Sequence, residues 1–150
     1  MRGRNARHTE VTMQTSILST NIPARQSISD PVHFQQATVV GIVMPTSGWT
    51  PAVVSLQGSP LGTNFYDLFD GIPGVNPGAE VVFNVRPGIM VNLNPNRMRC
   101  CAAIRLRSGT RDIPIIQAAT RQFLIIVEGD VVQEPYPFPF ADINDEPLKD

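Results

Sequence analysis

Apolar residues at every second position, interrupted at short intervals by turn residues, constrain this chain more than any other feature. Val81, Phe83 and Val85 alternate with Asn84 and Arg86. A period of two places successive side chains on opposite faces of a strand, so one face is buried and the other is solvated. The same alternation predicts strands of this kind at 52–57, 81–85, 89–93 and 102–107.

Two nearly continuous apolar runs, 38–44 and 123–127, predict central strands. The connections between runs are short and rich in glycine, proline, asparagine and serine, as at Pro87-Gly88 and Ser108-Gly109. Many short strands punctuated in this way are typical of sandwiches and jelly rolls. We therefore predict an all-β fold, a single antiparallel β-sandwich of jelly-roll-like type, with a short helical turn at Pro95–Arg99.

The distribution of charge divides the chain into three parts. The chain has 150 residues and a net charge of −1, and a chain of this length forms one domain. The basic residues 1–10 are predicted to form an N-terminal arm, and residues 11–128 the β-sandwich domain. The acidic residues 129–150 are predicted to form an extended C-terminal strap.

The strap contains three aromatic residues that alternate with prolines in Glu134-Pro-Tyr-Pro-Phe-Pro-Phe140. Proline lacks a backbone donor and favours extended geometry in the residue before it, so this segment cannot continue a helix or a central strand. Each exposed aromatic side chain would cost roughly 1.5 to 3 kcal/mol of lost burial. We therefore expect Tyr136, Phe138 and Phe140 to dock on a surface, either of this domain or of a neighbour.

Several strand-and-turn phrases between residues 26 and 128 are familiar from one group of proteins. They are Val40-Gly-Ile-Val-Met-Pro45, Gly48-Trp-Thr50, Val54-Ser-Leu-Gln-Gly-Ser59, Asn64-Phe-Tyr-Asp-Leu-Phe-Asp70, Ile104-Arg-Leu-Arg-Ser-Gly-Thr110 and Gln117-Ala-Ala-Thr-Arg121. With these phrases the chain resembles small β-sandwich structural proteins of tailed bacteriophages, which bind the assembled head as decoration or cement proteins. The Gly- and Pro-rich loop at 71–78 and the C-terminal strap depart from that pattern.

The resemblance implies a structural role in the virion. Its expected partner is the major capsid protein on the outer capsid surface, and the chain is expected to be a homo-oligomer, either a dimer or a trimer, made in the host cytoplasm. A position in the neck or tail is the alternative location.

Arginine side chains are the candidate contacts to such a partner. Eleven of the twelve basic residues are arginine, which binds carboxylates through a planar, multi-bond contact at interfaces. We expect Arg2, Arg4 and Arg7 to meet acidic groups, such as those of the strap of another subunit, and Arg105 and Arg107 to meet an acidic shell. The alternative is that both termini are solvated.

The sequence offers little that would support catalysis. It has two histidines, His8 and His33, which lie far apart, and no nucleophile elbow, phosphate loop or zinc-binding helix. Asp67 and Asp70 are spaced so that a strand would place them on opposite faces. We therefore predict no enzyme activity, no cofactor and no metal site.

The adjacent cysteines Cys100 and Cys101 are expected to be reduced thiols, because a bridge between neighbouring residues would be strained.

A carbohydrate-binding β-sandwich is the main alternative function. It depends on Trp49, the single tryptophan, as a candidate for stacking on a sugar ring. The competing interpretation is that Trp49 fills the core where a strand meets its loop.

Nucleic acid and membrane are not expected as partners. Arg97, Arg99, Arg105, Arg107 and Arg111 cluster without interleaved stacking aromatics, and no apolar run approaches the length of a membrane span.

Overall fold

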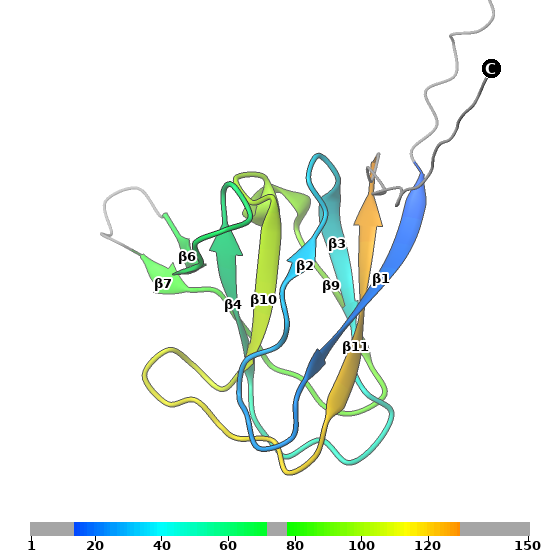
Figure 1. The fold of residues 1–150 in the computed structure, drawn as a ribbon, viewed down its shortest axis with the longest axis vertical. Coiled ribbons are helices and arrows are strands. Elements are labelled where there is room, and N and C mark those ends of the chain that lie inside the picture. Colours follow the sequence, from blue (N-terminus) through cyan, green and yellow to red (C-terminus); the bar gives the residue numbers. More distant parts are fainter. Residues whose placement is uncertain (1–13, 72–77, 130–150) are drawn as a thin grey trace, which may run out of the picture.

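The computed structural model describes residues 14–71 and 78–129, and this part of the chain is all-β with one four-residue 3-10 helix (Figure 1). In chain order the elements are β1 (Thr15–Ile22), β2 (Val32–His33), β3 (Thr38–Val43), β4 (Val54–Ser59), β5 (Tyr66–Asp67), β6 (Phe69–Asp70), β7 (Ala79–Glu80), β8 (Val82–Phe83), β9 (Met90–Asn92), the helix η2 (Pro95–Met98), β10 (Ala103–Ser108) and β11 (Arg121–Glu128).

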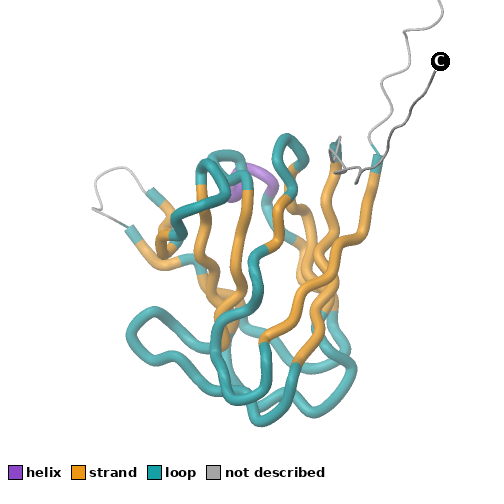
Figure 2. Tube along the Cα trace, in the orientation of Figure 1, coloured by secondary structure: helices purple, strands orange, loops and turns teal. Residues whose placement is uncertain are grey.

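The strands form two main antiparallel sheets. The first sheet has the order β1-β11-β3-β9, and the second has the order β2-β10-β4-β5 with β8 also paired to β4. A small separate pair is formed by β6 and β7. Figure 2 shows that the strands run alongside one another while the loops gather at their ends. The predicted all-β fold with antiparallel sheets is confirmed.

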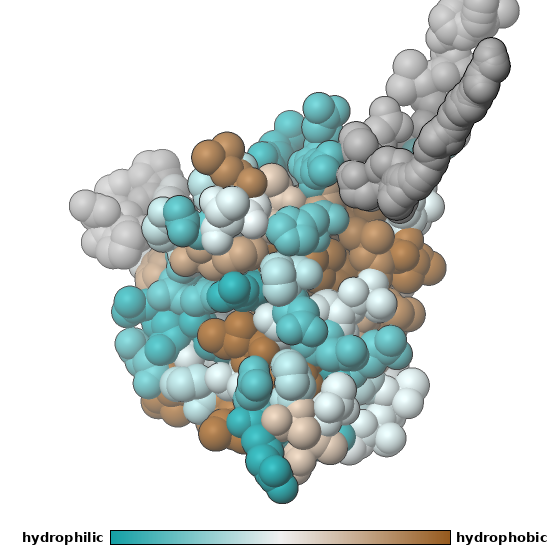
Figure 3. Space-filling model, in the orientation of Figure 1, coloured by the Kyte–Doolittle hydropathy of each residue, from teal (hydrophilic) through white to brown (hydrophobic). Residues whose placement is uncertain are grey.

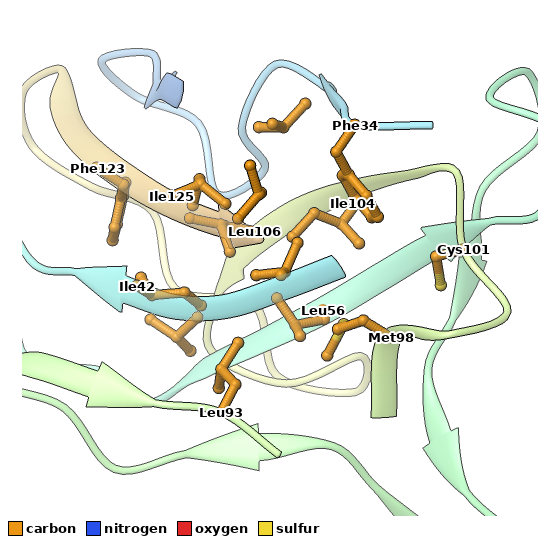
Figure 4. Packing of buried hydrophobic residues seen from close by; sticks show 14 of the residues in the cluster. Phe34, Ile42, Leu56, Leu93, Met98, Cys101, Ile104, Leu106, Phe123 and Ile125 are labelled. Atoms are coloured by element: carbon orange, nitrogen blue, oxygen red, sulfur yellow. The ribbon is translucent and has the colours of Figure 1, made fainter. Parts of the chain in front are cut away.

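The core lies between the inner faces of the two sheets (Figure 4). Ile42, Phe123 and Ile125 of the first sheet face Leu56 and Ile104 of the second, and all are buried. Large apolar side chains of this kind each contribute roughly 1.5 to 3 kcal/mol when they leave water. The alternation seen in the sequence therefore locates the inner face correctly along the long strands.

The helix η2 confirms the helical turn predicted at Pro95–Arg99. The Asn94 side chain caps it by accepting a hydrogen bond from the Asn96 N–H at 3.0 Å, and proline occupies the first helical position. Met98 at its end is buried in the core. The turn that follows carries Cys100 to the surface and Cys101 into the interior.

The outer face of the second sheet is covered, and here the sequence prediction was wrong. The strand at 102–107 was predicted to have a solvated face, yet Ala103 and Arg107 on that face of β10 are buried. The chain from β5 to β8 pairs with β4 beside them and supplies the acidic residues that contact Arg107. A segment distant in sequence buries this face. The local alternation of apolar and polar residues cannot reveal such a contact.

The predicted arm at 1–10 and nearly all of the predicted strap lie outside the described residues. The boundaries of the domain predicted at 11–128 therefore remain predictions.

Candidate interaction surface

The outer face of the first sheet carries a stripe of apolar side chains that no other element of the described chain covers. The stripe consists of Ile17 on β1, Ile126 and Leu124 on β11, Val43 on β3 and Met90 on β9. Ile17 and Met90 are 63% and 61% exposed, and the other three are partly exposed. Figure 3 shows hydrophobic surface along the side of the molecule that β1 and β11 form.

Strand register makes these side chains neighbours. Ile17 lies opposite Ile126, Leu124 lies opposite Val43, and Val43 lies opposite Met90. Directly opposed residues have Cβ atoms about 4.5 to 5.5 Å apart, so the apolar contacts continue from one edge of the sheet to the other. The alternate residues of β11, such as Phe123 and Ile125, point into the core instead.

A shallow hollow of about 280 Å³ adjoins one end of the stripe. Val43 and Leu124 line it together with polar residues, among them Arg121 and Gln122. The Arg121 guanidinium is held by the side chain of Gln117, whose Oε1 accepts from Nε at 3.1 Å. This end of the face thus combines an apolar floor with a positioned cation, which suits a protein partner better than a small apolar molecule.

Arg107, predicted as a contact to a shell, is instead enclosed in an internal ionic cluster. Its guanidinium donates to Asp67 Oδ1 at 2.7 Å, to Glu80 Oε2 at 2.8 Å and to Ser55 Oγ at 2.9 Å. The side chain is only 6% exposed. A partner cannot reach this guanidinium, because the carboxylates and the chain that carries them cover it.

Burial and hydrogen bonding oppose one another at Asp67. Burial alone would raise the pKa of this carboxyl, but hydrogen bonds from Arg107, Arg111 and Gln57 outweigh burial and hold the pKa below its ordinary value. Because the folded chain has the lower pKa, the stabilising contribution is present above that ordinary value. It is lost as the pH falls through the folded pKa.

Arg105, the second arginine predicted on this strand, lies over the ring of Phe65, with its Cζ 4.2 Å from the ring centroid. Its side chain is partly buried, so it differs from Arg107 in remaining accessible at the surface. The predicted role of Arg105 in partner binding stays a prediction.

Trp49 cannot stack on a sugar ring. It is 6% exposed, packs edge-on against Phe123 at 5.6 Å between ring centroids, and donates from Nε1 to the Ala52 carbonyl at 3.2 Å. The interpretation of Trp49 as a residue that fills the core is confirmed, and its candidate role in ligand stacking was wrong.

The other predicted contact residues, Arg2, Arg4, Arg7, Tyr136, Phe138 and Phe140, lie outside the described residues.

The carboxylates considered for catalysis serve as ion-pair partners. Asp70 binds Arg97 at 3.3 Å, while Asp67 belongs to the Arg107 cluster. Within residues 14–71 and 78–129 no group of three or more His, Cys, Asp or Glu side chains is placed to hold a metal ion. Over the same residues, no helix has the length and apolar character needed to cross a membrane.

The two thiols have different environments. Burial, together with the neighbouring Cys100, raises the pKa of Cys101 to about 12. Cys101 therefore stays protonated near neutral pH and packs as a small apolar side chain.

In comparisons with known proteins, no family model, no curated protein and no solved structure matches the chain. The resemblance to tailed-phage structural proteins therefore stays a prediction.

Proposed function

We propose that this chain is a structural protein of a tailed-phage virion, a capsid decoration or cement protein that binds the assembled head shell and stabilises it across subunit seams. The major capsid protein is the proposed partner, and the outer capsid surface is the proposed location. The apolar stripe on the outer face of the first sheet carries this proposal. The stripe would act by binding a partner, because contiguous exposed apolar surface is typical of partner-binding sites.

The strand order supports a jelly-roll type of β-sandwich, as the sequence predicted. Eight strands divided as β1-β11-β3-β9 and β2-β10-β4-β5 are the arrangement expected of two interlocked Greek keys. Jelly rolls occur in viral capsid proteins and also in lectins, so the fold is compatible with this function without requiring it.

Carbohydrate binding loses its support, because Trp49, the aromatic side chain on which it depended, is buried. A structural position in the neck or tail would use the same apolar face, and only the partner would differ.

Met90 and Asn92 provide a matched test of the adhesive face. Both are exposed on β9, and both project from the outer face two residues apart. Met90→Asp removes an apolar contact and adds a charge, whereas Asn92→Asp adds only the charge. We expect Met90→Asp to weaken binding to empty shells at least tenfold, roughly 1.4 kcal/mol, and Asn92→Asp less than threefold.

The measurement is co-sedimentation of purified protein with shells that lack it, at several protein concentrations. An equal loss of shell binding in both variants would mean that the added charge, and not the lost apolar contact, weakens binding. Wild-type protein that fails to sediment with the shells would contradict the proposal.

A further inference from the structure

The exposed edge of β1 is an open position in the first sheet. β1 pairs with β11 over its full length with no break in register. In the described part of the chain no strand pairs with its other edge, and Figure 1 shows β1 at the rim of the molecule.

Two hydrogen bonds define which backbone groups point to this open edge. The Gln14 carbonyl accepts from the Gly129 N–H at 3.0 Å, on the side of β11, and the Asn21 carbonyl accepts from the Asp30 N–H at 3.0 Å, on the opposite side. Successive residues of a strand direct their N–H and C=O groups to opposite sides. Thr15, Ile17 and Ser19 therefore direct theirs to the open edge.

The chain at Asp30 covers the end of this edge at Thr20 and Asn21, but from Thr15 to Ser19 the edge has none of the usual protection. Natural edge strands carry charged side chains, prolines or bulges that prevent another strand from adding. β1 has the sequence Thr-Ser-Ile-Leu-Ser-Thr-Asn-Ile, with no charge and no proline. An unprotected edge of this kind is a template on which a further strand can pair.

The sequence Glu134-Pro-Tyr-Pro-Phe-Pro-Phe140, outside the described residues, has the pattern that such a strand requires. In an extended chain the N–H groups of Tyr136, Phe138 and Phe140 would all point to one side. The prolines would occupy the other side, where no donor is present. The segment can therefore add to one edge, and its own outer edge would not recruit another strand.

The point where the chain leaves the sheet favours the same chain as the source. Gly129 is bonded to Gln14, the residue before β1. Residues 130–134 can span at most about 16 to 18 Å, and crossing from β11 past β1 to the next strand position takes about 10 Å. The segment would then run in the same direction as β1, because this linker is too short to reach the far end first.

We propose that residues 134–140 add in cis, as a parallel strand, to the open edge of β1. In a parallel pairing in which Tyr136 and Phe138 direct their N–H groups to β1, their side chains lie on the same face of the sheet as Leu18, which is only partly buried against the core. The prolines then form the new edge of the sheet. This pairing is independent of the proposed shell binding, and either can fail without the other.

Amide hydrogen exchange of the full chain, followed by NMR, tests the proposal. The Ile17 and Ser19 amides should be protected in the wild type and should exchange at least tenfold faster when Tyr136, Phe138 and Phe140 are all replaced by Ser. Ser16 and Leu18 direct their amides to β11, so they serve as internal controls and should not change. Equal exchange of Ile17 and Ser19 in the two proteins would overturn the proposal.

Single substitutions test the pairing, and dilution tests whether the added strand comes from the same chain. Phe138→Pro removes a donor that faces β1 and should release the Ser19 amide, while Pro137→Ala should leave protection unchanged. Protection that is independent of protein concentration supports addition in cis. Protection that falls on dilution would show that the strand comes from a second copy, which overturns the proposal of a single chain.

Discussion

At the scale of single residues, Arg107 shows how a side chain on an apparently solvated position becomes structural. Its strand alternates as an exposed face would, but Asp67 and Glu80 come from a segment far away in sequence and enclose it. A buried charge needs such partners, because an unpaired ion in the interior is strongly unfavourable. Arg107 therefore contributes to the stability of the domain and does not belong to the surface proposed to bind a partner.

We predict that Arg107→Met lowers the free energy of unfolding by about 3 to 5 kcal/mol, since it leaves Glu80 without its ion-pair partner and Asp67 with one fewer. Arg111→Met is the matched control. Arg111 also binds Asp67, at 3.1 Å, but its side chain is far more exposed to solvent, which screens the ion pair, so its loss should cost much less than the loss of Arg107. Urea unfolding of the two variants measures the difference.

Similar stability of Arg107→Met and wild type would mean that the cluster contributes little. That result would contradict the stabilising role assigned to Arg107.

At the scale of elements, the sequence predicted strands best where apolar residues recur strongly. β4, β10 and β11 coincide closely with the predicted runs, because most of their inward residues are apolar. β1 was not assigned, since its inward positions include Thr20 and its outward positions include Ile17, which blurs the pattern. The short strand β8 lies within the predicted run at 81–85. The short strands β5 to β7 depend on pairing with distant partners, and short pairings of this kind leave little trace in local sequence.

β1 also yields a prediction that uses two serines of one strand. The Ser16 N–H faces β11, opposite Val127, while the Ser19 N–H faces the open edge. Ser16→Pro should therefore cost about 1 to 3 kcal/mol, because it removes a donor from the ladder with β11. In the chain whose Tyr136, Phe138 and Phe140 are replaced by Ser, where the proposed added strand is absent, Ser19→Pro should cost less than about 1 kcal/mol, as measured by thermal or urea unfolding.

In that chain, equal destabilisation by the two prolines would contradict the assignment of the open edge. β1 would then offer no free backbone groups to the proposed strand at 134–140.

At the scale of the whole molecule, the candidate site was only partly predictable. The run at 123–127 correctly indicated a central strand, but it suggested cover on both faces. One face of β11 is in the core, and the other carries Leu124 and Ile126 at the surface. The sequence shows which side chains are apolar. It does not show whether such a side chain is covered by its own chain or by a partner.

We propose that the outer face of the β1-β11-β3-β9 sheet adheres to a viral shell. Electron cryo-microscopy of shells decorated with this protein tests it most directly. We predict density for the domain on the outer capsid surface, oriented with Ile17, Leu124 and Met90 against the major capsid protein. Shells without added density, or a bound domain whose apolar face points to solvent, would contradict it.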